Sequence, residues 1–159
     1  MKPTLRFLVS DPAHFIALGF GSGLMPKGPG TAGTLVGWLL FPFVRAPLSD
    51  PLFGGLLLAS FLFGILACER TGRALGVADH GGIVWDEIVA IWLVLWLTPP
   101  TLAWQTTAFV LFRFFDIVKP PPIRWVDERT RGGLGVMFDD LLAAGYTLLV
   151  LALLVRLIA

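Results

Sequence analysis

The chain has 159 residues, of which 56% are hydrophobic and 14% are charged. Soluble domains are about 45–50% apolar and about 25% charged, so this composition excludes an ordinary soluble protein and indicates an integral membrane protein. The net charge is +1 and the basic residues form no dense run, which argues against a nucleic-acid partner. At about 20 residues per spanning helix, residues 1–159 are expected to form one all-α membrane domain without a separate soluble domain.

Apolar runs in the first half of the chain predict one short helix and two spans. Residues 11–20 predict a short N-terminal helix in the membrane interface, because the run is too short to cross a bilayer. Residues 31–46 predict the first spanning helix, but Pro42 lies inside the run, so full crossing and re-entry both stay open. Residues 51–68 form an apolar run free of charged residues and predict the second span.

Three further spans are expected in the second half, each with acidic residues near one end. The third covers residues 83–97, the fourth 102–118 and the fifth 139–158. The third contains Asp86 and Glu87 in its first turns, and the fourth is stopped by three prolines that begin at Pro120. The fifth opens on Asp139 and Asp140, which suit the positive end of a helix dipole. The predicted fold is therefore a bundle of about five transmembrane helices.

The distribution of Lys and Arg predicts the orientation of this bundle. With the N-terminus in the cytoplasm, nearly all basic residues of the connections lie on the cytoplasmic side, as the positive-inside rule requires. The same model brings the polar residues of separate segments to the cytoplasmic ends of their helices: Thr31, Asp79, Asp86, Glu87, Asp116, Lys119, Asp139 and Asp140. We therefore expect one polar site at the cytoplasmic face.

Five carboxylates from three helices predict a metal site there. They are Asp86, Glu87, Asp116, Asp139 and Asp140. Acids in a membrane segment are costly unless something binds them, and Mg²⁺ prefers oxygen ligands of this kind. Adjacent helical residues point about 100° apart, so one member of each adjacent pair is expected to be a direct ligand and the other a neighbour or a general base. Which acid is the base, and whether one or two ions bind, stay open.

Basic and hydroxyl side chains near these acids are candidates for phosphate binding. Arg113 lies three residues before Asp116, so it forms a plain ion pair or grips phosphate oxygens. Lys119 is either an interfacial lysine or a second phosphate ligand. Thr31 and Thr34 lie where a helix N-terminus could bind an anion. The alternative makes Thr31 an ordinary N-cap and the nearby glycines, Gly33 and Gly37, a helix-packing face.

Four motifs carry a resemblance to a known family. They are Pro-Gly-Thr-Ala-Gly-Thr at 29–34, Ile-Val-Trp-Asp-Glu at 83–87 preceded by Asp79, Arg-Phe-Phe-Asp-Ile-Val-Lys-Pro at 113–120, and Gly-Gly-Leu-Gly-Val-Met-Phe-Asp-Asp at 132–140. In order and spacing they resemble the phosphatidylglycerophosphatase A family of bacterial membrane lipid phosphatases, over residues 21–146. The departures are Ala90 and Ala144, where glycine is expected in many members.

The resemblance implies a Mg²⁺-dependent enzyme of the bacterial cytoplasmic membrane that releases the terminal phosphate of phosphatidylglycerophosphate. The site that it implies comprises Thr31, Asp79, Asp86, Glu87, Arg113, Asp116, Lys119, Asp139 and Asp140, with Asp79 and Thr34 as possible supporting residues. The alternative function is a small transporter or ion-conducting bundle. Such a protein is expected to carry polar residues in mid-span and often internal repeats, and neither is apparent in the sequence.

Overall fold

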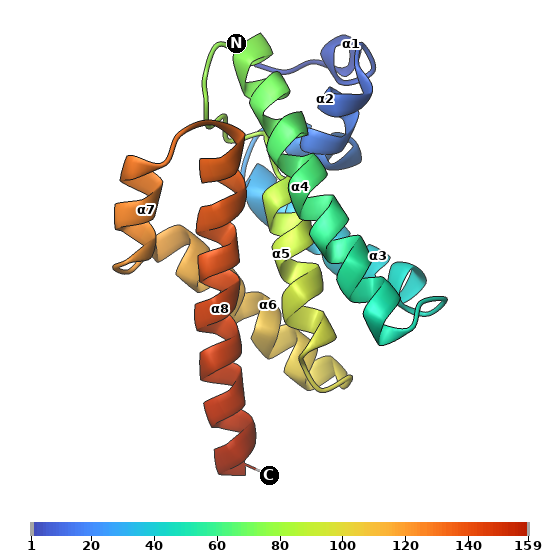
Figure 1. Ribbon diagram of the computed structural model, residues 1–159, viewed down its shortest axis with the longest axis vertical. Coiled ribbons are helices and arrows are strands. Elements are labelled where there is room, and N and C mark those ends of the chain that lie inside the picture. The colour runs from blue at the N-terminus through green and yellow to red at the C-terminus, as the bar shows by residue number, and fades with distance from the viewer. Residues whose placement is uncertain (1, 159) are drawn as a thin grey trace.

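The computed structural model describes residues 2–158, and their secondary structure is helical throughout (Figure 1). The helices in chain order are α1 (Leu5–Leu8), α2 (Pro12–Ala17), the 3-10 helix η1 (Gly19–Leu24), α3 (Pro29–Arg45), α4 (Asp50–Leu75), α5 (Trp85–Trp96), α6 (Leu102–Val118), α7 (Ile123–Arg129) and α8 (Gly132–Ile158). Nearly every side chain of α5 is buried. This short helix is therefore the centre of the bundle, against which α3, α4, α6 and α8 pack.

Glycines on α3 allow it to lie close against α5. A Cβ atom on Gly33 would lie 2.5 Å from Cβ of Val84, and one on Gly37 would lie 2.7 Å from a methyl of Ile91. Only a residue without a side chain permits this approach. The predicted helix-packing face of Gly33 and Gly37 is confirmed, and it places the first turn of α3 beside the first turn of α5.

The long helices α4 and α8 also cross in close contact. A Cβ atom on Gly133 would lie 1.9 Å from the carbonyl oxygen of Ile65. At the same crossing the backbone N–H of Gly133 donates to Oε2 of Glu69 at 2.7 Å, so a carboxylate from α4 satisfies an unpaired N–H at the start of α8. Figure 1 shows that both helices extend past the first turn of α5. Residues in that turn are therefore flanked by both long helices.

Local sequence explains the bounds of α6. The hydroxyl of Thr101 accepts a hydrogen bond from the backbone N–H of Trp104 at 3.4 Å and caps the first turn. At the other end, Lys119 takes the left-handed conformation with φ of 46°, and the prolines that follow cannot continue the helix. The predicted bounds of 102–118 are those observed.

Other predicted bounds need correction. Helix α8 begins at Gly132 rather than at 139, so the interpretation of Asp139 and Asp140 as a helix N-terminus is wrong. Both acids lie about two turns inside α8, and Glu69 occupies the N-terminal position instead. Helix α3 continues through Pro42 to Arg45, and α4 extends to Leu75. The short helix expected at 11–20 is α2, followed by η1, while α1 and α7 were not predicted.

Two helices, α4 and α8, are long and apolar enough to cross a membrane. They have 26 and 27 residues, whereas α3 and α6 have 17 residues each and α5 has 12. At about 1.5 Å per residue, α5 extends about 18 Å, which is less than the roughly 30 Å of a hydrocarbon core. The protein is therefore a helical protein with two candidate spans, and a count of five stays a prediction.

Candidate active site

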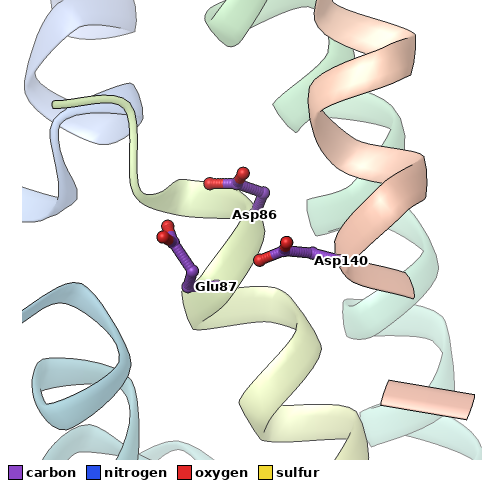
Figure 2. Close-up of side chains that lie close together, drawn as sticks. All are labelled: Asp86, Glu87 and Asp140. Atoms are coloured by element: carbon purple, nitrogen blue, oxygen red, sulfur yellow. The ribbon is translucent and has the colours of Figure 1, made fainter. Parts of the chain in front are cut away.

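Three buried carboxylates converge between α5 and α8. Asp86 and Glu87 project from the first turn of α5, and Asp140 points toward them from α8 (Figure 2). One oxygen of each lies within 4.8 Å of the others. The exposed fractions are 9% for Asp86, 8% for Glu87 and 2% for Asp140. We call these three residues the acidic cluster.

Each acid of the cluster has an oxygen without a hydrogen-bond partner in the described chain. These atoms are Oδ1 of Asp86, Oε2 of Glu87 and Oδ2 of Asp140. Buried polar atoms in proteins are nearly always hydrogen-bonded, and like charges at this separation repel one another. Hard divalent cations take oxygen ligands of this type. The donor set therefore fits Mg²⁺, because one ion could take an oxygen from each of the three carboxylates and offset most of their negative charge.

Arg113 connects the acidic cluster to α3 and α6. Its Nη1 lies 2.6 Å from Oδ2 of Asp116, one turn along α6, and 3.6 Å from Oε1 of Glu87. The same nitrogen donates to the hydroxyl of Thr34 at 3.3 Å, and that hydroxyl donates to the carbonyl of Gly30 at 2.8 Å. The expected ion pair of Arg113 with Asp116 is confirmed, and phosphate binding by the guanidinium stays a prediction.

Asp116 and Asp139 lie outside the acidic cluster. Asp116 is paired with Arg113 and interacts electrostatically with Asp140. Asp139 is hydrogen-bonded through Oδ2 to Nζ of Lys119. Of the two adjacent acids on α8, only Asp140 enters the acidic cluster, whereas Asp86 and Glu87 on α5 both enter it. The long side chain of Glu87 reaches back to it despite the different direction. Which of these acids bind a metal ion directly stays a prediction.

Lys119 forms a second charged group beside the acidic cluster. Besides Asp139, its Nζ contacts Oδ1 of Asp127 on α7 at 3.1 Å. Burial lowers the pKa of Lys119, but its hydrogen bonds and ion pairs with the two carboxylates raise it more, so the pKa lies above its usual range. The ammonium therefore stays protonated at neutral pH. It is held at the left-handed end of α6, where a non-glycine residue is uncommon.

Two predicted residues lie farther from the cluster. The N-cap of α3 is Gly28, with φ of 61°, so the alternative of Thr31 as an N-cap is wrong. Thr31 lies in the first turn of α3 with an exposed side chain. Asp79 is exposed in the connection between α4 and α5, where it interacts electrostatically with Lys119 and Asp127. Thr34, in contrast, is fully buried and contacts Arg113.

Sequence reasoning missed two residues of this region. Gly30 touches the site directly, since a Cβ atom there would lie 2.3 Å from Oε1 of Glu87 and 3.1 Å from Nη2 of Arg113. Gly30 lies in the Pro-Gly-Thr-Ala-Gly-Thr motif, but from the sequence we expect only an anion-binding turn there and no contact with Glu87. Asp127 lies on α7, a helix that the sequence analysis did not predict, so nothing in its own surroundings indicated a contact with Lys119.

Comparisons with known proteins agree with the motifs. The family model described as phosphatidylglycerophosphatase A matches residues 15–155. The chain is 44% identical over 151 residues to phosphatidylglycerophosphatase A of Haemophilus influenzae, covering 94% of this chain and 92% of that protein. It is 43% identical over 143 residues to phosphatidylglycerophosphatase A of Escherichia coli, covering 87% and 80%.

A third relative carries a different name. The chain is 39% identical over 145 residues to a putative phosphatidylinositol-3-phosphatase of Bacteroides thetaiotaomicron, covering 86% of this chain and 89% of that protein. No solved structure matches this chain.

Proposed function

Since this chain belongs to the phosphatidylglycerophosphatase A family and hydrolyses phosphatidylglycerophosphate to phosphatidylglycerol and phosphate, we propose that the acidic cluster and its basic neighbours are the site of this reaction. The observation that carries the proposal is the set of three unpartnered oxygens on the buried carboxylates of Asp86, Glu87 and Asp140. A transporter is not favoured, because the curated relatives named above are phosphatases.

Mg²⁺ is the cofactor that we propose for this site. Asp86, Glu87 and Asp140 would hold the ion, with the phosphate and water completing its oxygen ligands. A bound Mg²⁺ supplies Lewis acidity toward a phosphate oxygen and makes water more acidic. Asp116 and Asp139 remain close enough to contribute charge, but their side chains already pair with Arg113 and Lys119.

The basic residues and one carboxylate perform the remaining steps. Arg113 and Lys119 offset the negative charge of the phosphate as the phosphorus–oxygen bond to glycerol breaks. One carboxylate of the α5 pair, Asp86 or Glu87, accepts a proton from the attacking water on its second oxygen, and the protonated carboxyl then gives this proton to the leaving alkoxide oxygen. Arg113 also positions Glu87 through their contact at 3.6 Å. Thr34 supports Arg113 from α3.

We further propose that α3, α4, α5, α6 and α8 lie as one bundle in the bacterial cytoplasmic membrane, with α4 and α8 crossing its full thickness and the site facing the cytoplasm. The distribution of Lys and Arg supports this orientation. The polar residues also occur where α5 begins and α6 ends, which suits a site at the level of lipid headgroups. In this arrangement the acyl chains stay in the bilayer while the headgroup reaches the acidic cluster.

Phosphate release from phosphatidylglycerophosphate by the purified protein tests the site and the cofactor. We expect release with Mg²⁺, none in excess chelator, and a loss of at least about 10²-fold in kcat for Asp86→Asn, the order seen when one electrostatic group is removed. Asp50→Asn is the matched control, because Asp50 is exposed and pairs with Arg45 at the other end of α4. Release that persists in chelator, or an Asp86→Asn rate equal to that of the control, would contradict the proposal.

Labelling of a single cysteine tests the orientation. Cys68 is buried and is first replaced by Ala, and Glu128→Cys then places a thiol on the exposed face of α7 near Lys119. A membrane-impermeant maleimide is expected to label this thiol only in inverted vesicles. Labelling in intact spheroplasts would contradict the cytoplasmic placement of the site.

A further inference from the structure

An apolar cavity adjoins the acidic cluster from the side of the bundle. It has a volume of about 260 Å³ and lies between α4, α5 and α8. Asp86 contributes to its wall, and every other lining residue is apolar. Along α5 the wall runs from Asp86 to Leu93, about 10 Å at the rise of an α-helix. The cavity therefore connects the carboxylates to the interior of the proposed membrane region.

The cavity opens on the outer surface of the bundle. Leu58, which lines it from α4, is 60% exposed, whereas Ala90 on the opposite wall is 3% exposed. The flanking helices α4 and α8 are the two with the length and apolarity to cross a membrane. An apolar opening between such helices faces hydrocarbon rather than water. A molecule that enters here comes from the bilayer.

We infer that this cavity binds the upper part of an acyl chain of the lipid substrate, so that the lipid enters between α4 and α8 with its headgroup at the Asp86 end. The inference rests on the proposed site of hydrolysis. Complete ligands fill cavities of roughly 300–1,000 Å³, so the smaller volume suits a segment of one chain. Asp86, which also belongs to the acidic cluster, is the point at which the apolar wall meets the proposed site.

Other occupants fit less well. A helix of a second copy is about 10 Å across with its side chains, which is wider than a cavity of this volume accommodates. An unrelated bilayer lipid could also insert a chain, but it lacks the terminal phosphate monoester that Arg113 and Lys119 are proposed to bind. The substrate lipid fits both ends of this region, because its acyl chain matches the apolar wall and its phosphate matches the positive charges of Arg113 and Lys119.

Larger side chains in the cavity wall test the inference through the preference of the enzyme for long or short acyl chains. Leu93→Trp fills the cavity two turns of α5 beyond Asp86, and Leu58→Trp narrows its mouth. The control is Leu66→Trp, which is also on α4 and 69% exposed but does not line the cavity. Each variant is assayed with dipalmitoyl and with dihexanoyl phosphatidylglycerophosphate, since the hexanoyl chains are too short to fill the cavity as far as Leu93.

For Leu93→Trp we expect kcat/KM on the dipalmitoyl lipid to fall about tenfold, the effect of about two methylene groups losing their burial. Activity on the dihexanoyl lipid should change less than about twofold, and the control should resemble the wild type with both. Equal losses on the two lipids, or no loss on either, would overturn the inference. Failure of the proposed function looks different, because metal-dependent release would then be absent from the wild type with both lipids.

Photo-crosslinking provides a readout that does not depend on turnover or on the tryptophan variants. A non-hydrolysable phosphonate analogue of phosphatidylglycerophosphate with a diazirine on its acyl chain is bound to the wild type in the presence of Mg²⁺ and irradiated. Labelled peptides should contain the cavity-lining residues of α4 and α5, in excess over labelling by a phosphatidylcholine analogue. Equal labelling of the cavity by the two analogues, or crosslinks between two copies of the protein at Leu58→Cys, would contradict substrate binding there.

Discussion

Replacing Gly30 with alanine should separate catalysis from stability. The added Cβ atom would lie 2.3 Å from Oε1 of Glu87, whereas ordinary van der Waals contact begins at 3.4 Å, so the carboxylate must move by the difference of about 1 Å. A displacement of about 1 Å in a reacting group can cost about 10²-fold in rate. Alanine is also a better helix former than glycine by about 1 kcal/mol, so the fold itself should not be weakened by the change in α3.

The assay compares two identical substitutions. Gly145 lies in α8, and a Cβ atom there meets nothing within 4 Å in the described structure, so Gly145→Ala gains the helix preference without a clash. We expect Gly30→Ala to lose about 10²-fold in kcat at an unchanged melting temperature, and Gly145→Ala to retain the wild-type rate. Wild-type activity in Gly30→Ala would refute the reasoning that this glycine sets the position of Glu87.

The remaining predictions concern charge, packing and pH. Lys119→Ala should lower kcat/KM on phosphatidylglycerophosphate by about 10²-fold, because the ammonium that offsets phosphate charge is lost; a change below twofold would remove it from the site. Gly133→Ala should lower the stability by about 1–3 kcal/mol in denaturant titrations in detergent, since its Cβ would lie 1.9 Å from the carbonyl of Ile65, whereas Gly145→Ala should not. Burial lowers the pKa of His14 below its ordinary 6.5, so protonation favours the unfolded chain. The stability that the neutral ring contributes is present above pH 6.5 and is lost as the pH falls. When the pH is lowered from 8 to 5, the melting temperature should therefore drop more for the wild type than for His14→Asn. Equal drops in the two proteins would contradict this.

Helix positions could be predicted wherever a local signal marks both ends. Residues 102–118 have a capping threonine before them and prolines after them, and α6 has those bounds. The start of α8 could not be placed in this way. Three glycines at 132–135 favour a loop by local preference, but Glu69 supplies a cap from α4, and the absence of side chains permits the crossing with Ile65. A contact between residues distant in the sequence decided that boundary.

The sequence predicted some of the residues that lie together in the candidate site, but not which side chains pair with one another. Charge bias and motif order indicated that acids of three helices belong together, and Asp86, Glu87 and Asp140 do lie together. The direction of Asp139 depends on Lys119, whose backbone conformation at the end of α6 the sequence does not reveal. The part played by Gly30 follows only from the close packing of α3 on α5, because a glycine has no side chain whose chemistry could indicate a contact.

Cation binding tests the central claim, that the acidic cluster holds a divalent metal ion, without reference to turnover. Mn²⁺ is titrated into the purified protein in detergent and the free ion is measured by electron paramagnetic resonance, for the wild type, Asp140→Asn and the control Asp50→Asn. We predict that the wild type and the control bind Mn²⁺, that Mg²⁺ competes, and that Asp140→Asn weakens binding by at least about tenfold, as expected for the loss of a carboxylate ligand. Equal binding by Asp140→Asn and the wild type would contradict the account.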